Sequence, residues 1–204
     1  MASELFFIYD THCPWSYVST PLVRAIHQAF PEITLNLWHN AYFCSAESKV
    51  NNKQLDEITS LIGFDFSPSY INNIMDNKNS ILAANLMTWV SNKSPAHALD
   101  LLTQLQQAHF EQGNELTKES DVDHIINELK LSPPAKVFKN DKLSNDAQAQ
   151  VEEIFALQEI IQTEAIPALL LAIDNELILL SHNLYLKEPQ AIVEAVKLEL
   201  NKYK

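Results

Sequence analysis

Tyr9-Asp10-Thr11-His12-Cys13-Pro14-Trp15-Ser16-Tyr17 is the stretch from which the rest of the chain can be interpreted. The apolar, partly aromatic run Leu5–Ile8 precedes it and is typical of a buried strand. Apolar side chains then recur at helical spacing from Val18 to Phe30. We therefore predict a strand over 5–8 and a helix over 14–30, with Cys13 at the junction between them.

The helix that begins here should affect the chemistry of Cys13. Pro14 suits a first helical position, because its fixed φ fits and its missing N–H has no helical partner there. The free N–H groups and the dipole of a helix N-terminus favour a thiolate. A free thiol has a pKa of about 8.5, which helix N-termini lower to roughly 3.5–7.5, so we expect a lowered pKa for Cys13. The alternative is that Cys13 is only a small buried hydrophobic residue.

Apolar and polar residues alternate over 33–38, which predicts an edge strand with one buried face. Strand, helix and strand together form a βαβ unit, which should be parallel with a right-handed crossover. Parallel strands end on the same side of a sheet, so Cys44 should lie on the same side as Cys13.

From about residue 49 to residue 144 the sequence has a helical pattern. Three apolar stripes lie over 55–62, 82–90 and 101–108, and Gly113 occupies the position of a C-terminal cap after the third. Ser120 is the expected N-cap of a further helix, which Pro133-Pro134 should end.

The last quarter of the chain returns to a mixed pattern. A helix is predicted over 146–163 and a continuously apolar central strand over 168–173, directly after Pro167. Asp174-Asn175 is a turn sequence that leads to a hairpin partner over 177–180, and Pro189 should open a final helix. The order βαβ–α–ββα predicts an α/β core made of 1–48 and 145–204, with an all-helical insertion over 49–144.

Three motifs in this arrangement resemble a known family. Cys13-Pro14-Trp15-Ser16 is similar to the Cys-x-x-Cys of thioredoxin-fold disulfide oxidoreductases, with serine in place of the second cysteine. Together with Tyr17, it resembles the cytoplasmic DsbA-like proteins of the FrnE type. The segment Ala108–Glu115 resembles the end of that family's helical insertion, and Ile166–Leu169 resembles its cis-proline strand. Ser16 also resembles the motif of two related families, the kappa-class glutathione transferases and the 2-hydroxychromene-2-carboxylate isomerases, in which serine replaces Cys13.

The resemblance implies a thioredoxin fold and a set of site residues. Cys13 and Ser16 would be catalytic, and a cis Ile166–Pro167 bond would face Cys13 across the cleft. The expected substrate-binding residues are His12, Pro14, Trp15, Ile166 and Pro167. His12 could add positive charge near the thiol or point into solvent.

Serine at position 16 limits the chemistry. A dithiol site resolves its own mixed disulfide by attack from the second cysteine, and a hydroxyl cannot do this. Ser16 can at most donate a hydrogen bond to the thiolate. A self-contained dithiol cycle would need Cys44, whose alternative interpretation is an unreactive thiol near a loop.

The composition excludes some classes of binding partner. The chain has 204 residues, 47% of them hydrophobic, and a net charge of −12, which argues against nucleic acid and anionic membranes as partners. No apolar run is long enough to span a bilayer, and a basic N-terminal region is missing, so we expect a cytoplasmic protein. The histidines show no paired spacing typical of metal ligands, and we expect no metal and no tightly bound cofactor.

Three hypotheses follow from these observations. The first is a monothiol thiol–disulfide oxidoreductase, with glutathione as the expected co-substrate and a small thiol or protein disulfide as substrate. The second is a glutathione-dependent transferase or isomerase in which Cys13 or Ser16 activates the glutathione sulfur. The third is a peptide- or ligand-binding module without turnover. The resemblance also makes a homodimer possible.

Overall fold

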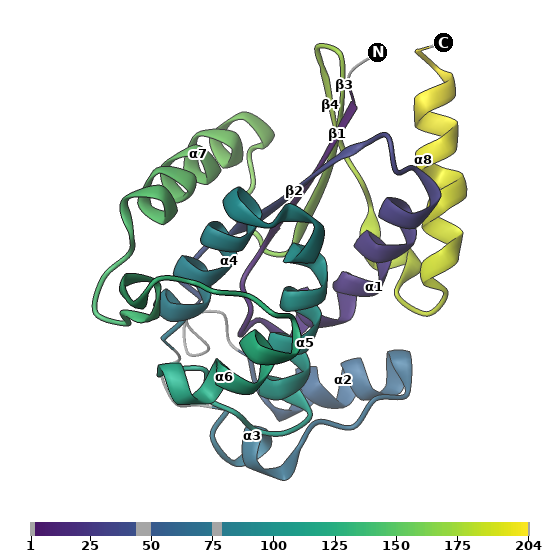
Figure 1. Cartoon of the computed structure of the whole chain (residues 1–204). Coiled ribbons are helices and arrows are strands. Elements are labelled where there is room, and N and C mark those ends of the chain that lie inside the picture. Colours follow the sequence, from purple (N-terminus) through teal and green to yellow (C-terminus); the bar gives the residue numbers. More distant parts are fainter. Residues whose placement is uncertain (1–2, 44–49, 75–78, 204) are drawn as a thin grey trace.

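A computed structural model describes residues 3–43, 50–74 and 79–203 of the chain, and its centre is a four-stranded sheet in the order β2-β1-β3-β4 (Figure 1). The strands are β1 (Ser3–Tyr9), β2 (Thr34–His39), β3 (Ala168–Ile173) and β4 (Glu176–Leu179). β1 runs parallel to β2 and antiparallel to β3. The predicted edge strand, the central apolar strand and the hairpin are thereby confirmed.

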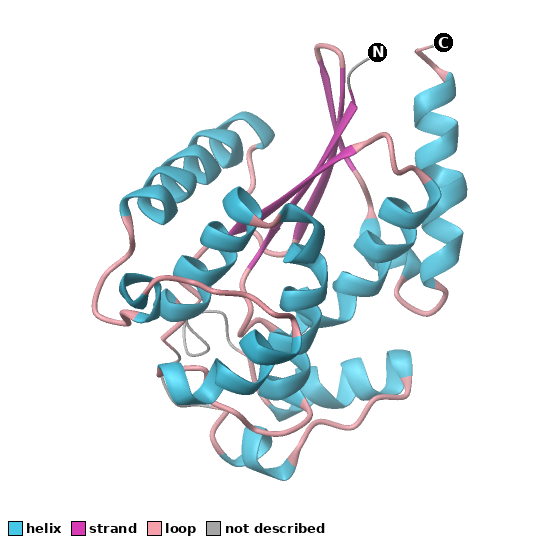
Figure 2. Ribbon diagram, viewed as in Figure 1, coloured by secondary structure: helices cyan, strands magenta, loops and turns pink. Residues whose placement is uncertain are grey.

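Helices cover both faces of this sheet (Figures 1 and 2). α1 (Pro14–Ala29) and α8 (Ile192–Asn201) pack together on one face. α7 (Asn145–Ile161) lies on the other face, and α4 (Ile81–Lys93) lies beside it; both contact β2. A chain that runs strand, helix, strand with a right-handed crossover places its helix on one face, so a second layer is needed to bury the other.

The alternation of side chains along β1 divides the core between the two layers. Leu5, Phe7 and Tyr9 belong to the large cluster beneath α1, whereas Ile8 packs with Ile154 of α7 on the opposite face. This period of two is what a strand imposes, and it explains why the central strands are apolar at consecutive positions.

The remaining helices lie at the end of the sheet that is remote from the two termini (Figure 1). They are α2 (Asn52–Ile62), α3 (Pro68–Asn72), α5 (Ala98–Phe110) and α6 (Glu119–Glu128). Short 3₁₀ helices are η1 (Pro95–His97), η2 (Ala135–Phe138), η3 (His182–Tyr185) and η4 (Pro189–Ala191). None of the helices in the described part of the chain combines the length and apolar character needed to cross a membrane.

Several predicted helix ends differ from the structure. Ser120 is not an N-cap, because the Asp121 carboxylate accepts hydrogen bonds from the N–H groups of Thr117 and Lys118 and starts α6 at Glu119. α6 also ends before Pro133-Pro134, and Lys130 has a φ of +53°. Sequence analysis missed α3 entirely, since five residues are too few to show a helical period.

The predicted division of the chain remains a prediction. α4 falls within the predicted insertion 49–144, yet it contacts β2 and α7, and most of its buried apolar side chains belong to the main core cluster. The inserted segment therefore contributes to the core layer as well as to the helices at the end of the sheet.

Candidate functional site

Cys13 is the N-cap residue of α1, at the position that the sequence predicted, and Pro14 is the first residue of the helix. The loop from β1 to α1 is tight: the Cys13 N–H donates to the Asp10 carbonyl at 3.1 Å, and the Tyr17 N–H donates to the Cys13 carbonyl at 3.0 Å. β1 thus delivers Cys13 directly to a helix N-terminus.

The environment of the Cys13 thiol combines opposing effects. Only 2% of the residue is exposed, and this burial raises the pKa of Cys13 to about 11. Hydrogen bonds from the Ser16 side chain and N–H, and from the Trp15 N–H, act in the opposite direction by favouring the thiolate, while Asp10 adds to the raised pKa. The expected lowered pKa is therefore wrong for this conformation, because the sequence reveals the helix N-terminus but not the burial.

Asp10 lies wholly buried beneath the thiol and organises the loop around it. Its carboxylate accepts hydrogen bonds from the His12 N–H at 2.9 Å, the Ser80 hydroxyl at 2.8 Å and the Phe43 N–H at 3.3 Å. Its own N–H donates to the Ser16 hydroxyl at 3.3 Å. One carboxylate therefore ties the ends of β1 and β2 to the start of α4.

Two buried histidines face this carboxylate. His39 Nδ1 lies 3.9 Å from one oxygen of Asp10, and His12 Nδ1 lies 3.6 Å from the other. Burial alone would raise the pKa of Asp10, but His39 and the hydrogen bond of His12 outweigh it and hold that pKa well below its usual range. Burial lowers the pKa of His39 to about 4, although Asp10 opposes this. Near neutral pH the loop therefore holds a carboxylate beside a neutral His39.

The segment that follows α5 covers His12. The His12 ring nitrogen Nε2 lies 3.2 Å from the Glu115 carbonyl, and the His12 ring packs edge to face on His109 at 4.4 Å. Gly113, in the same segment, has a φ of +72°, and a Cβ there would lie 2.5 Å from Ser69 Cβ. The resemblance motif Ala108–Glu115 is thus the cover of the cysteine loop.

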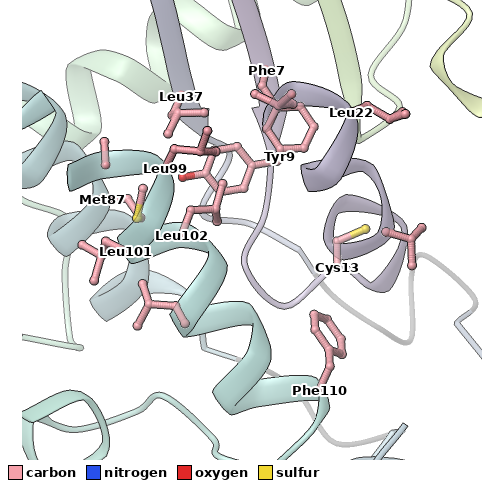
Figure 3. Packing of buried hydrophobic residues seen from close by; sticks show 14 of the residues in the cluster. Phe7, Tyr9, Cys13, Leu22, Leu37, Met87, Leu99, Leu101, Leu102 and Phe110 are labelled. Atoms are coloured by element: carbon pink, nitrogen blue, oxygen red, sulfur yellow. The ribbon is translucent and has the colours of Figure 1, made fainter. Parts of the chain in front are cut away.

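Aromatic side chains complete the cover. Figure 3 shows the Phe110 ring, from the last residue of α5, extending toward the turn that carries Cys13. Tyr17 stacks on Phe110 at 4.9 Å, and its hydroxyl donates to Glu111 Oε1 at 2.7 Å. Burial raises the pKa of Tyr70, and the charge of a Cys13 thiolate raises it further, which places Tyr70 of α3 near the thiol.

A cavity of about 510 Å³ lies beside the first turn of α1, and we call it the cis-proline cavity. Trp15 lines one side, Ile166 and Pro167 line another, and the segment 179–183 closes it. The Ile166–Pro167 bond is cis, as predicted. His182 lines the same cavity, and burial lowers its pKa.

The structure brings together some of the predicted site residues. Trp15, Ile166 and Pro167 line one cavity, and Ser16 contacts Cys13. His12 and Pro14 are buried and are absent from the described lining of the cavity, so the alternative in which His12 points into solvent is wrong. Their role in substrate binding stays a prediction.

Other predictions and omissions concern neighbouring residues. Cys44 lies outside the described residues, so its placement beside Cys13 is untested. Sequence analysis missed His39, Tyr70 and His182. The parallel pairing of Tyr9 with His39 could have indicated the first, because both residues end adjacent strands. Among the described residues, no group of three or more His, Cys, Asp or Glu side chains is placed to hold a metal ion.

This arrangement defines the class of fold. A parallel β1–β2 pair, an antiparallel β3–β4 hairpin, a cysteine at the start of the first helix and a cis-proline before β3 are the elements of a thioredoxin fold. Here the fold is interrupted by helices between β2 and α7.

Solved structures agree with this assignment, whereas no protein-family model and no curated protein matches the chain. The cytosolic disulfide reductase DsbM from Pseudomonas aeruginosa superimposes with a TM-score of 0.81 at 18% identity, over 97% of this chain and 98% of that chain. Its structure with GSH gives 0.79 at 17% identity, over 97% and 99%. A periplasmic thioredoxin-like protein from Salmonella enterica serovar Typhimurium gives 0.53 at 15% identity, over 95% and 83%. At these identities the likeness shows a shared fold, the DsbA-like thioredoxin fold expected from the sequence.

Proposed function

We propose that this protein is a cytoplasmic thiol–disulfide oxidoreductase that works through the single thiol of Cys13, with glutathione as co-substrate. The observation that carries the proposal is the position of Cys13 at the N-terminus of α1, hydrogen-bonded by Ser16 and two residues before Trp15, which lines the cis-proline cavity. The fold shared with a disulfide reductase, one structure of which contains GSH, supports the same activity.

The proposed cycle uses two thiol–disulfide exchanges. The Cys13 thiolate attacks the glutathione sulfur of a mixed disulfide, the S–S bond breaks, and the substrate sulfur leaves as a thiolate that takes up a proton. A second glutathione thiolate then attacks the glutathione sulfur held on Cys13. Oxidised glutathione leaves, the Cys13 thiolate is restored, and the two electrons gained by the substrate come from glutathione.

A substrate cannot reach the Cys13 thiol in the closed conformation. At 2% exposure Cys13 cannot meet a disulfide without movement of its cover, and burial is the leading cause of its raised pKa. Movement that exposes Cys13 removes that cause, whereas Ser16 and the helix N-terminus keep favouring the thiolate. Opening would therefore expose and activate the thiol together.

Turnover of a glutathionylated peptide by glutathione, coupled to glutathione reductase and followed as NADPH consumption, tests the proposal. Cys13→Ser should abolish the activity, and a mass increase of one glutathione on Cys13 should appear when the second thiol is withheld. Cys44→Ser is the matched control, because it removes the chain's other cysteine. Equal loss of activity in both variants would show a dithiol cycle, and full activity in Cys13→Ser would remove Cys13 from the mechanism.

The cis-proline cavity is the proposed binding site for glutathione. A tripeptide can lie against Trp15 and pair its backbone with the chain at Ile166, in the manner of an added strand. His182→Ala should weaken glutathione binding in a calorimetric titration, with Leu184→Ala as the control on the same short helix. Leu184 is 73% exposed and does not line the cavity. Equal binding to both variants would place glutathione elsewhere.

The raised pKa of Cys13 favours a second candidate, a binding module without turnover. Such a protein has no use for an activated thiol, so its cysteine can stay buried. The two candidates differ in one measurement. A module would bind glutathione or a peptide with equal affinity in the wild type and in Cys13→Ser, and it would show no turnover.

A further inference from the structure

A second cavity, of about 390 Å³, lies on the other side of Leu186 from the cis-proline cavity, since Leu186 lines both. We call it the Arg24 cavity. Its apolar walls are Tyr17, Val18, Pro21, Ile62, Phe64 and Leu186. They come from α1, from the end of α2 and from the segment before η4, and several of them are only half-buried. Its volume is in the range of small-molecule sites.

The charge of this cavity is opposite to that of the protein. The chain carries a net charge of −12, and Arg24 is its only arginine. Arg24 and Lys187 both line the cavity, and no Asp or Glu belongs to the described residues that line it. An anion with an apolar body suits this lining, although Asp100 offsets part of the Arg24 charge.

A buried amide adds a specific hydrogen-bonding group. Gln106 of α5 lines the cavity and is 0% exposed. Its Oε1 accepts a hydrogen bond from Thr20 Oγ1 at 2.7 Å, whereas its Nε2 has no hydrogen-bond partner among the described residues. A buried N–H without a partner costs about 1–3 kcal/mol, so an oxygen that reaches this amide through a small shift of the cavity wall would be stabilising.

Arg24 is held in place and retains further donors. Its Nη1 lies 2.9 Å from Asp100 Oδ1, and its Nη2 donates to Thr103 Oγ1 at 2.8 Å. Half of the Asp100 side chain is exposed, so this ion pair is screened by water. A guanidinium has five N–H donors, so Arg24 can keep these contacts and still bind a carboxylate.

From these observations we infer that the Arg24 cavity is a binding site for a small carboxylate with an aromatic or branched aliphatic body. The apolar body lies against Phe64, Ile62 and Val18. The carboxylate faces Arg24 and Lys187, with the Gln106 amide within reach. This site is separate from the thiol chemistry proposed for Cys13 and does not depend on it.

Binding of 4-phenylbutyrate, compared with 4-phenylbutanol and 4-phenylbutylamine, tests the inference. These probes share a phenyl ring and a short alkyl chain and differ in the head group, which is anionic, neutral or cationic. Backbone amide shifts in NMR titrations of the full chain locate the site and give the affinity. We expect saturable shifts along 17–24, 103–107 and 186–189, with a Kd for the acid below about 1 mM and at least roughly fivefold weaker binding of the alcohol.

Variants sharpen the test. Arg24→Met should weaken binding of the acid roughly tenfold. Lys187→Met should weaken it roughly threefold, because the Lys187 side chain is exposed. Asp100→Asn should act in the opposite direction and tighten binding, since it releases Arg24 from its ion pair. Lys187→Met should leave the affinity for the alcohol unchanged.

Four results would overturn the inference, and none of them requires a variant to fold; the first three concern affinity and location. They are equal affinities for the three probes, shifts confined to the cis-proline cavity around Ile166 and His182, and no saturable shift with any probe. Shifts at the Arg24 cavity that favour the amine would also overturn it, because they would reverse the expected sign of the ligand.

Discussion

The two halves of the candidate site differ in their exposure to solvent. The cysteine half, from Asp10 to Ser16, is buried apart from Trp15 and is covered by α3 and the segment after α5. The cis-proline half, from Thr163 to Pro167 and from Leu179 to Asn183, surrounds an open cavity. In the proposed function, the cysteine half would supply the reacting thiol and the cis-proline half would admit the substrate. Reactivity at Cys13 therefore depends on the cover more than on the cavity.

Removing the buried charge should cause the largest effect. Asp10→Asn keeps the shape of the side chain but removes the charge that faces His39 and His12. We expect a loss of about 3–5 kcal/mol in the free energy of unfolding, because the carboxylate accepts three buried hydrogen bonds and each bond to a charged group is worth about 1.5–3 kcal/mol. Urea denaturation measures it.

Asp123→Asn on the exposed surface of α6 is the control for that variant and should change stability by less than about 0.5 kcal/mol. Equal stabilities of the two variants would mean that the cysteine half is not organised by Asp10.

The second-largest effect should be a loss of stability in acid, caused by the buried groups of the cysteine half. His39 has a folded pKa of about 4, below the unfolded value of about 6.5. Between these values the unfolded chain binds a proton that the folded chain excludes, so stability falls as pH drops from 6.5 to 4, by roughly 3 kcal/mol. The lowered pKa of Asp10 adds a further loss below about pH 4, where the unfolded carboxylate protonates first.

The measurement is unfolding free energy against pH for the wild type and His39→Gln. The variant should be less stable at pH 7 and flatter from pH 6.5 to pH 4. Parallel curves would show that His39 titrates in the folded protein as it does in the unfolded chain.

The cover can be tested with a pair of glycines. Gly113 and Gly63 both have a positive φ, of +72° and +68°, but a Cβ at Gly113 would meet Ser69 at 2.5 Å, whereas nothing lies within 4 Å at Gly63. Gly63→Ala should cost about 1 kcal/mol from backbone conformation, and Gly113→Ala about 2–3 kcal/mol because the cover must also shift.

The second readout for this pair is alkylation of Cys13. It should become faster in Gly113→Ala, because a displaced cover exposes the thiol, and should stay unchanged in Gly63→Ala. Faster alkylation in both variants, or in neither, would show that the cover does not control access to Cys13.

The smallest expected effect concerns Ser16. Alkylation of Cys13 should keep accelerating with pH toward about 11, the raised pKa of the buried thiol. Ser16→Ala removes a hydrogen bond that favours the thiolate, so it should raise that pKa and slow alkylation at pH 8 roughly three- to tenfold. Ser19→Ala, one turn further along α1, is the control. A plateau near pH 8.5 would show a thiol in contact with water.

Periodicity and strand order predicted the sheet well, because both are local. The edge position of β2 followed from alternation over 33–38, and the central position of β3 from a continuous apolar run. The cysteine also had a local signal in Pro14 and the strand before it.

The burial of Cys13 could not be predicted from the sequence around it. The pKa of Cys13 is raised chiefly by burial, and the cysteine loop is covered in part by residues distant in the chain, such as Glu115, whose carbonyl lies beside His12; nothing in the sequence near Cys13 indicates this contact. The same holds for Ser80, which completes the bonds of Asp10 from the start of α4. Tertiary contacts of this kind decide whether a helix N-terminus faces water or the core.

In the proposed cycle, the carboxylate of Asp10 would also affect the release of a substrate joined to Cys13. A sulfur leaves a disulfide faster when its thiol has a low pKa. Asp10 and burial both raise the pKa of Cys13, so in the closed protein Cys13 is a poor leaving group. A partner once joined to it would stay attached until the cover opened again. If Cys13 works as proposed, motion of the segment 109–115 would set the lifetime of the covalent complex, and a slow cover would make this thiol a trap for its substrates.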